Sequence, residues 1–139
     1  MEEIKQVPYG VSDFVTVRER NLYYVDKTMY LSLLEQQPDS LFYIRPRRFG
    51  KSLFISMLQA YYDKAMSDRF DSLFGGLWVH EHPTPLRGRY QMLYLDFSQV
   101  GGDIDQISTH FEEYCKVKLD GFMRKYQNEY PGVVVKAFF

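Results

Sequence analysis

The chain has 139 residues, of which 45% are hydrophobic and 17% aromatic, so it is large and apolar enough to bury a core. Its formal net charge of −1 excludes a generally basic surface that would attract nucleic acid or acidic membranes. The single cysteine, Cys115, excludes an intrachain disulfide and a zinc site made of cysteines. No stretch approaches the roughly 20 apolar residues of a membrane span, and no signal-peptide pattern is present, so we expect a cytoplasmic protein.

The first 40 residues predict a helical lead-in with one short strand. Asp13 can cap a helix that runs to residue 20 and carries Phe14 and Val17 on one side. Residues 22–25 form a strand candidate. A second helix is predicted over residues 27–37, with Asp26 at its N-cap. Its buried stripe is expected to consist of Tyr30, Leu33 and Leu34.

Residues 41–63 carry the pattern that matters most for function. The run from Leu41 to Ile44 has strand composition, and a loop that ends in Gly50-Lys51-Ser52 follows it. Apolar residues then recur at helical spacing, at Leu53, Phe54, Met57, Leu58 and Tyr61. Strand, loop, Gly-Lys-Ser and helix is the order that a phosphate-binding loop requires.

The chemistry of this order points to a nucleoside triphosphate. A helix N-terminus has unpaired backbone N–H groups and the positive end of the helix dipole, so it stabilises an anion. Gly50 lets the backbone approach a phosphate closely, and Lys51 can reach the outer phosphates. The hydroxyl of Ser52 can bind Mg²⁺. We therefore expect ATP and Mg²⁺ as the ligands.

The loop departs from the usual Gly-x-x-x-x-Gly-Lys-Ser/Thr pattern at its first position. Arg45 stands where the first glycine belongs, and Pro46 fixes its own φ and pushes Arg45 toward extended geometry. Arg47 and Arg48 would add positive charge near the phosphates. The predicted nucleotide-binding residues are Arg45, Pro46, Arg47, Arg48, Phe49, Gly50, Lys51, Ser52 and Leu53.

Other interpretations of the loop remain open. Gly-Lys-Ser could be a chance tripeptide beside three arginines in a solvated turn, although the flanking strand and helix favour phosphate binding. The basic loop 45–51 could instead bind the phosphate backbone of nucleic acid, which the near-zero net charge makes the weaker hypothesis. The run Asp26-Lys27-Thr28 favours a capping motif, and the alternative is that it borders the nucleotide base.

A further strand is predicted over residues 90–98, after a helix over 66–77 and a loop over 78–88. In that loop, His80-Glu81-His82 has no third ligand nearby and favours a polar loop over a zinc site. Asp96, at the end of the strand, is a candidate Mg²⁺ ligand beside Ser52, and a plain strand-end cap is the equal alternative.

In the last third of the chain, the spacing of apolar residues predicts a long helix after Gly101-Gly102-Asp103. Gly121 is a position where this helix is expected to bend or split. Cys115 lies near its apolar side and is expected to be a core thiol. Residues 133–139 form an apolar run at the end of the chain. An exposed apolar end is unusual for a finished domain, so we expect a truncated domain.

Three stretches resemble the bacterial AAA-ATPase-like domain family. The run of residues 45–58, Arg-Pro-Arg-Arg-Phe-Gly-Lys-Ser-Leu-Phe-Ile-Ser-Met-Leu, is closely similar to the family's loop. Tyr24-Val25-Asp26-Lys27-Thr28 before it and Leu95-Asp96-Phe97-Ser98 after it are similar to the same family. The resemblance implies that the missing first glycine is a family trait. It also implies that the Walker B strand and a nuclease-like domain of the PD-(D/E)xK type lie further along.

Together these features predict an α/β fold of the P-loop NTPase type, in which a mainly parallel sheet with neighbouring strands 41–45 and 90–97 is flanked by helices. Residues 1–139 are predicted to form one domain, with a lead-in over 1–40 and a nucleotide-binding core over 41–139. The expected function is ATP binding as the N-terminal part of a P-loop ATPase. We expect little or no turnover by this chain alone, because the acid, water-positioning and arginine groups of hydrolysis are not identifiable.

Overall fold

The structure is a computed structural model that describes residues 4–42, 44 and 50–129. The chain divides into two compact units, Met1–Tyr90 (unit 1) and Gln91–Phe139 (unit 2). Unit 1 contains α1 (Phe14–Glu19), the 3₁₀ helix η1 (Thr28–Tyr30), α2 (Leu31–Leu34), α3 (Lys51–Tyr62), the 3₁₀ helix η2 (Lys64–Arg69), α4 (Phe70–Phe74) and α5 (Trp78–Glu81).

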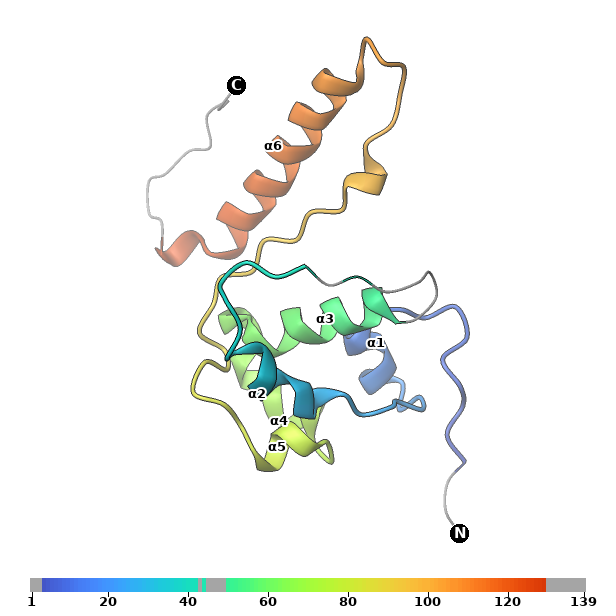
Figure 1. Cartoon of the computed structure of the whole chain (residues 1–139), viewed down its shortest axis with the longest axis vertical. Coiled ribbons are helices and arrows are strands. Elements are labelled where there is room, and N and C mark those ends of the chain that lie inside the picture. The colour runs from blue at the N-terminus through green and yellow to red at the C-terminus, as the bar shows by residue number, and fades with distance from the viewer. Residues whose placement is uncertain (1–3, 43, 45–49, 130–139) are drawn as a thin grey trace. The chain divides into compact units, whose positions relative to one another are not determined.

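Unit 1 is organised around α3, and Figure 1 shows α1 beside it. Every third or fourth residue of α3 is buried, because this spacing keeps Phe54, Met57 and Tyr61 on one face. These side chains join the core, which consists of Phe14, Leu31, Phe54, Met57, Ala60, Tyr61, Leu73, Phe74, Leu77 and Val79.

The helix α1 confirms the prediction for this part of the lead-in. The Asp13 carboxylate accepts a hydrogen bond from the Thr16 amide at 2.9 Å, as an N-cap does, and Phe14 and Val17 are fully buried. The Phe14 amide donates to Ser56 Oγ at 2.8 Å, which fixes the start of α1 against α3.

Arg18 connects α1 to the far end of α4. Its guanidinium donates to the carbonyl oxygens of Leu73 at 2.7 Å and Gly75 at 2.6 Å. The last carbonyls of a helix have no intrahelical partner. Arg18 therefore provides hydrogen-bond donors to carbonyls at the C-terminus of α4 that would otherwise lack them. Partial burial, the largest cause, lowers the pKa of Arg18.

The predicted α/β fold is wrong for the part of the chain that the structure describes. No β-strand forms in that part, and its β-type pairing is one isolated parallel bridge between Asp63 and Tyr90. Leu41, Phe42 and Ile44 of the expected first strand are 51%, 96% and 88% exposed. An apolar run becomes a strand only where a second strand pairs its backbone groups, and the described residues contain no such strand.

The second expected strand, residues 90–98, also fails to form for an identifiable reason. The Met92 amide donates to the Tyr126 hydroxyl at 2.8 Å, and the Asp96 amide donates to the Tyr114 hydroxyl at 2.6 Å. Tyrosine side chains thus take amide hydrogens that a neighbouring strand would need. Among the described residues, the predicted sheet of strands 41–45 and 90–97 is therefore absent, and helices joined by irregular segments are found instead.

Several element boundaries also differ from expectation. Residues 22–25 form no strand, and the helix expected over 27–37 is shortened to η1 and α2, with Leu31 as its buried apolar residue. Tyr30 and Leu33, which were expected to be buried, are 51% and 53% exposed. The predicted loop 78–88 contains α5, whose Val79 is fully buried.

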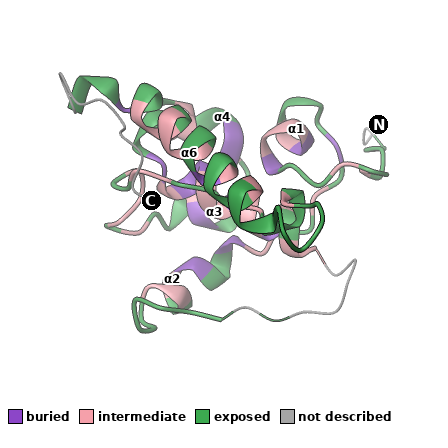
Figure 2. Cartoon of the chain, turned by 90° about the horizontal axis from the view of Figure 1, so that it is seen from above, coloured by how far each residue is buried: buried purple, intermediate pink, exposed green. Residues whose placement is uncertain are grey.

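The described part of unit 2, residues 91–129, contains an extended segment, the 3₁₀ helix η3 (Phe97–Gln99), α6 (Ile107–Lys125) and the 3₁₀ helix η4 (Gln127–Glu129). The expected long helix is present and runs through Gly121 without interruption. Most of α6 is exposed or half-buried (Figure 2), whereas Cys115 is buried as predicted. No helix among residues 4–42, 44 and 50–129 is long and apolar enough to cross a membrane.

Two tyrosines of unit 1 make its stability sensitive to high pH. Burial, and to a lesser extent the Asp26 carboxylate, raises the pKa of Tyr24 to about 12. Burial and the neighbouring Glu35 carboxylate also raise the pKa of Tyr62. Because tyrosines in an unfolded chain ionise near pH ~10, the contribution to stability is full below that pH and is lost as pH rises toward the folded-state pKa.

We therefore expect the free energy of unfolding of unit 1 to fall as pH rises from about 10 to about 12. Urea titrations followed by the fluorescence of Trp78, the single tryptophan, measure this fall. Tyr24→Phe should reduce it, whereas Tyr9→Phe should not, because Tyr9 is 97% exposed. An unchanged pH dependence in Tyr24→Phe would contradict this assignment.

Candidate functional site

The candidate site is the N-terminus of α3, next to the predicted nucleotide-binding residues. Of the predicted nucleotide-binding residues, Arg45, Pro46, Arg47, Arg48 and Phe49 lie outside the described residues. Gly50 immediately precedes α3, and Lys51 is its first residue. Gly50, Lys51 and Leu53 are half-buried, and Ser52 is exposed.

Gly50 has a backbone conformation that explains the residue type. Its φ is +78° and its ψ is 21°, which is the left-handed region that residues with a Cβ seldom adopt. Its carbonyl accepts the Phe54 amide at 2.9 Å, which is the first hydrogen bond of α3. The amides of the first turn point toward the N-terminus, as they do in any α-helix, and have no intrahelical partner, so the turn can receive an anion.

Lys27 lies at this helix start, although 23 positions separate it from Gly50 in the sequence. Its Nζ atom is 3.8 Å from the position that a Cβ on Gly50 would occupy. The side chain of Lys27 is half-buried, and no ion pair or hydrogen bond of its ammonium is seen in the described part of the chain. The structure thus adds a second lysine to the site beside Lys51.

Asp26 and Thr28, the neighbours of Lys27, bond to each other and also cap a distant helix. Asp26 accepts the Thr28 amide at 2.9 Å and the Thr28 hydroxyl at 2.6 Å. Its other carboxylate oxygen accepts the amide of Trp78 at 2.7 Å. Thr28 Oγ1 accepts the amide of Val79 at 3.1 Å. Asp26 and Thr28 therefore hold the N-terminus of α5, which the capping prediction did not foresee.

Asp96, the second predicted metal ligand, lies in unit 2 and caps η3. Its carboxylate accepts the Ser98 hydroxyl at 2.6 Å and the Ser98 amide at 3.0 Å. These bonds favour the charged carboxylate and lower the pKa of Asp96. The geometry agrees with the capping alternative, and the metal role of Asp96 and Ser52 stays a prediction.

The histidines of residues 80–82 make separate contacts. His80 Nε2 lies 2.9 Å from an Asp71 carboxylate oxygen, whereas the ring of His82 stacks on Trp78 with 4.3 Å between centroids. In the part of the chain that the structure describes, no three His, Cys, Asp or Glu side chains converge as metal ligands would.

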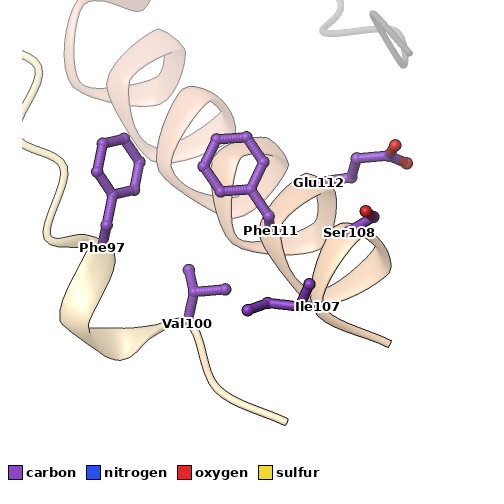
Figure 3. A pocket seen from close by; sticks show the side chains of 6 residues that line it. All are labelled: Phe97, Val100, Ile107, Ser108, Phe111 and Glu112. Atoms are coloured by element: carbon purple, nitrogen blue, oxygen red, sulfur yellow. The ribbon is translucent and has the colours of Figure 1, made fainter. Parts of the chain in front are cut away.

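Unit 2 carries a groove of about 450 Å³ between η3 and the first turns of α6 (Figure 3). It is lined by Phe97, Val100, Ile107, Ser108, Phe111 and Glu112. Its walls are mostly apolar, and the one charged group is a carboxylate, which would repel phosphate. This groove is therefore a poorer candidate for the anion site than the start of α3.

Comparison with known proteins gives a family and one partial relative. The model of the AAA-ATPase-like family, described as "Predicted AAA-ATPase", matches residues 8–138. A protein of Azotobacter chroococcum mcd 1, described as "Uncharacterized protein in vnfD 5'region", is 41% identical over 78 residues. That stretch is 55% of this chain and 14% of the relative, so the chain spans a small part of that protein. No solved structure matches the chain.

Proposed function

The chain belongs to the predicted AAA-ATPase family, and from this premise we propose that it binds ATP with Mg²⁺ at the N-terminus of α3. The observation that carries the proposal is the start of α3 at Lys51, directly behind a glycine in the left-handed conformation. This arrangement puts the positive end of a 12-residue helix and a lysine side chain at one point. The protein's proposed ligands at this point are the phosphoryl groups of the nucleotide.

Each residue of the proposed site has a distinct chemical role. Gly50 gives the phosphates close access to the backbone, and Lys51 contributes a positive point charge. The exposed hydroxyl of Ser52 suits Mg²⁺, which prefers oxygen ligands and neutralises phosphate charge when bound. Arg45, Arg47 and Arg48 would add positive charge, Pro46 and Phe49 would shape the loop before α3, and Leu53 lies in the first turn of α3.

We also propose that ATP hydrolysis requires more than this chain. Family membership supports ATPase chemistry, and the relative that matches is much longer than this chain. The chain is accordingly proposed to be the N-terminal part of a longer protein, with the Walker B acid and a nuclease-like domain further along. Any contact with nucleic acid is assigned to that longer protein.

Titration of ATP-Mg²⁺ against the wild-type chain and Lys51→Ala, by calorimetry, tests the proposal. A charged hydrogen bond to phosphate contributes substantially to the binding free energy. We therefore expect Lys51→Ala to bind ATP-Mg²⁺ at least about tenfold more weakly. The matched control is Lys64→Ala, which removes an exposed lysine at the opposite end of α3, about 18 Å away.

The outcomes separate the candidate functions. Equal affinity of wild type and Lys51→Ala for ATP-Mg²⁺ would overturn nucleotide binding at α3, as would no measurable binding by wild type. If the chain instead bound single-stranded nucleic acid with a steep salt dependence and ATP did not compete, the basic loop 45–51 would be a nucleic-acid contact.

A further inference from the structure

The position of Lys27 beside Gly50 points to a residue of the site that the phosphate-loop pattern does not contain. We propose that Lys27 supplies a second ammonium group to the phosphoryl chain of the nucleotide. This inference rests on the proposed function and names an additional phosphate-binding residue within it. The inference is based on the distance of 3.8 Å between Lys27 Nζ and the position that a Cβ on Gly50 would occupy.

The backbone around Lys27 is fixed, which keeps the lysine at the site. On one side, Asp26 bonds to the Trp78 amide at the start of α5. On the other side, Thr28 is fully buried and bonds to the Val79 amide. A residue that lies between two buried or bonded neighbours loses little backbone entropy when its side chain binds a ligand.

The charge of Lys27 is available for a ligand. Asp26 is the nearest acid in the sequence, but its two carboxylate oxygens already accept three hydrogen bonds, from the Thr28 amide and hydroxyl and the Trp78 amide. The described residues show no ion pair for Lys27. Lys27, Lys51 and the dipole of α3 thus bring positive charge to one place, and an anion of several charges stabilises such a cluster best.

An ammonium group selects the phosphoryl chain over the nucleotide base. It has three donors, no acceptor and no flat surface on which a base could stack. The acceptors of a base are neutral, whereas a phosphate oxygen is charged, so the ammonium binds a phosphate oxygen more strongly. The ligand of Lys27 is therefore a phosphoryl oxygen, with the triphosphate as the class that offers most of them.

The test uses two probes, ATP-Mg²⁺ and inorganic tripolyphosphate with Mg²⁺, on the full 139-residue chain. Lys27→Met keeps most of the length of the side chain and removes the charge. We expect this substitution to weaken the binding of both probes by a similar factor of about ten. Lys27→Arg, which keeps the charge, should recover most of the affinity, and Lys64→Met should bind both probes as wild type does. Thermal unfolding of each variant, followed by Trp78 fluorescence, verifies that it is folded.

The outcomes distinguish this inference from the proposed function. If Lys27→Met binds like wild type while Lys51→Ala is weakened, the role of Lys27 is disproved and the proposed function stands. If Lys27→Met weakens the binding of ATP but not that of tripolyphosphate, Lys27 contacts the base or ribose, and the inference is again wrong. If wild type binds neither probe, the proposed function fails and this inference fails with it.

Discussion

Replacing Phe14 with alanine is expected to lower the free energy of unfolding of unit 1 by about 3–5 kcal/mol. Phe14 is fully buried, and its ring lies 5.2 Å from that of Tyr24 and 4.9 Å from that of Phe74, between centroids. The substitution removes these aromatic contacts and leaves a cavity between α1 and the rest of the core. Urea unfolding followed by Trp78 fluorescence measures the loss.

Two further variants serve as controls for Phe14→Ala. Tyr9→Ala removes an aromatic side chain that is 97% exposed, so it should change stability by less than about 0.5 kcal/mol. If Phe14→Ala does not fold, Phe14→Leu keeps much of the volume, and we expect it to fold with an intermediate loss of about 1–2 kcal/mol. Equal stabilities of the Phe14 and Tyr9 variants would show that α1 is not part of the core.

Replacing Thr28 with valine is expected to cost about 1–3 kcal/mol, although the two side chains have nearly the same shape. Thr28 is fully buried, and its hydroxyl both donates to Asp26 and accepts the Val79 amide. Valine would leave that amide buried without a partner and would remove one of the three bonds to Asp26. The start of α5 should therefore loosen, which Trp78 fluorescence in a urea titration detects directly.

The matched control for this substitution is Thr16→Val. Thr16 also donates its hydroxyl to an aspartate, Asp13, at 2.8 Å, but this bond is exposed to water. Water can replace the lost partner there, so we expect a change of less than about 0.5 kcal/mol. A loss for Thr28→Val no larger than that for Thr16→Val would mean that Thr28 does not hold α5.

The sequence correctly predicted those elements whose signals are local. A capping aspartate followed by Phe14 and Val17 predicted α1, and the spacing of Phe54, Met57 and Tyr61 predicted α3 with its start at Lys51. Caps and helical periodicity act over three or four residues, so the sequence alone contains them. Gly50 was expected only to let the backbone approach a phosphate, and its positive φ is a second reason for a glycine at this position.

The strands were mispredicted because an apolar run does not specify its partner. Leu41 to Ile44 and Met92 to Leu95 have strand composition, yet their pairing depends on residues far away in the sequence. In unit 2, Tyr114 and Tyr126 provide hydroxyl groups to the extended segment, and no local pattern indicates that choice. Strand formation was therefore the part of the fold that composition could not decide.

The sequence by itself determined the helix that begins after Gly50 and the family of the chain, because the residues that indicate both are contiguous in the sequence. Only the tertiary structure decided that Lys27 lies beside Gly50 and that Asp26 and Thr28 hold α5. Those contacts join segments that are 23 to 52 residues apart, and such contacts depend on how the helices pack rather than on local propensity.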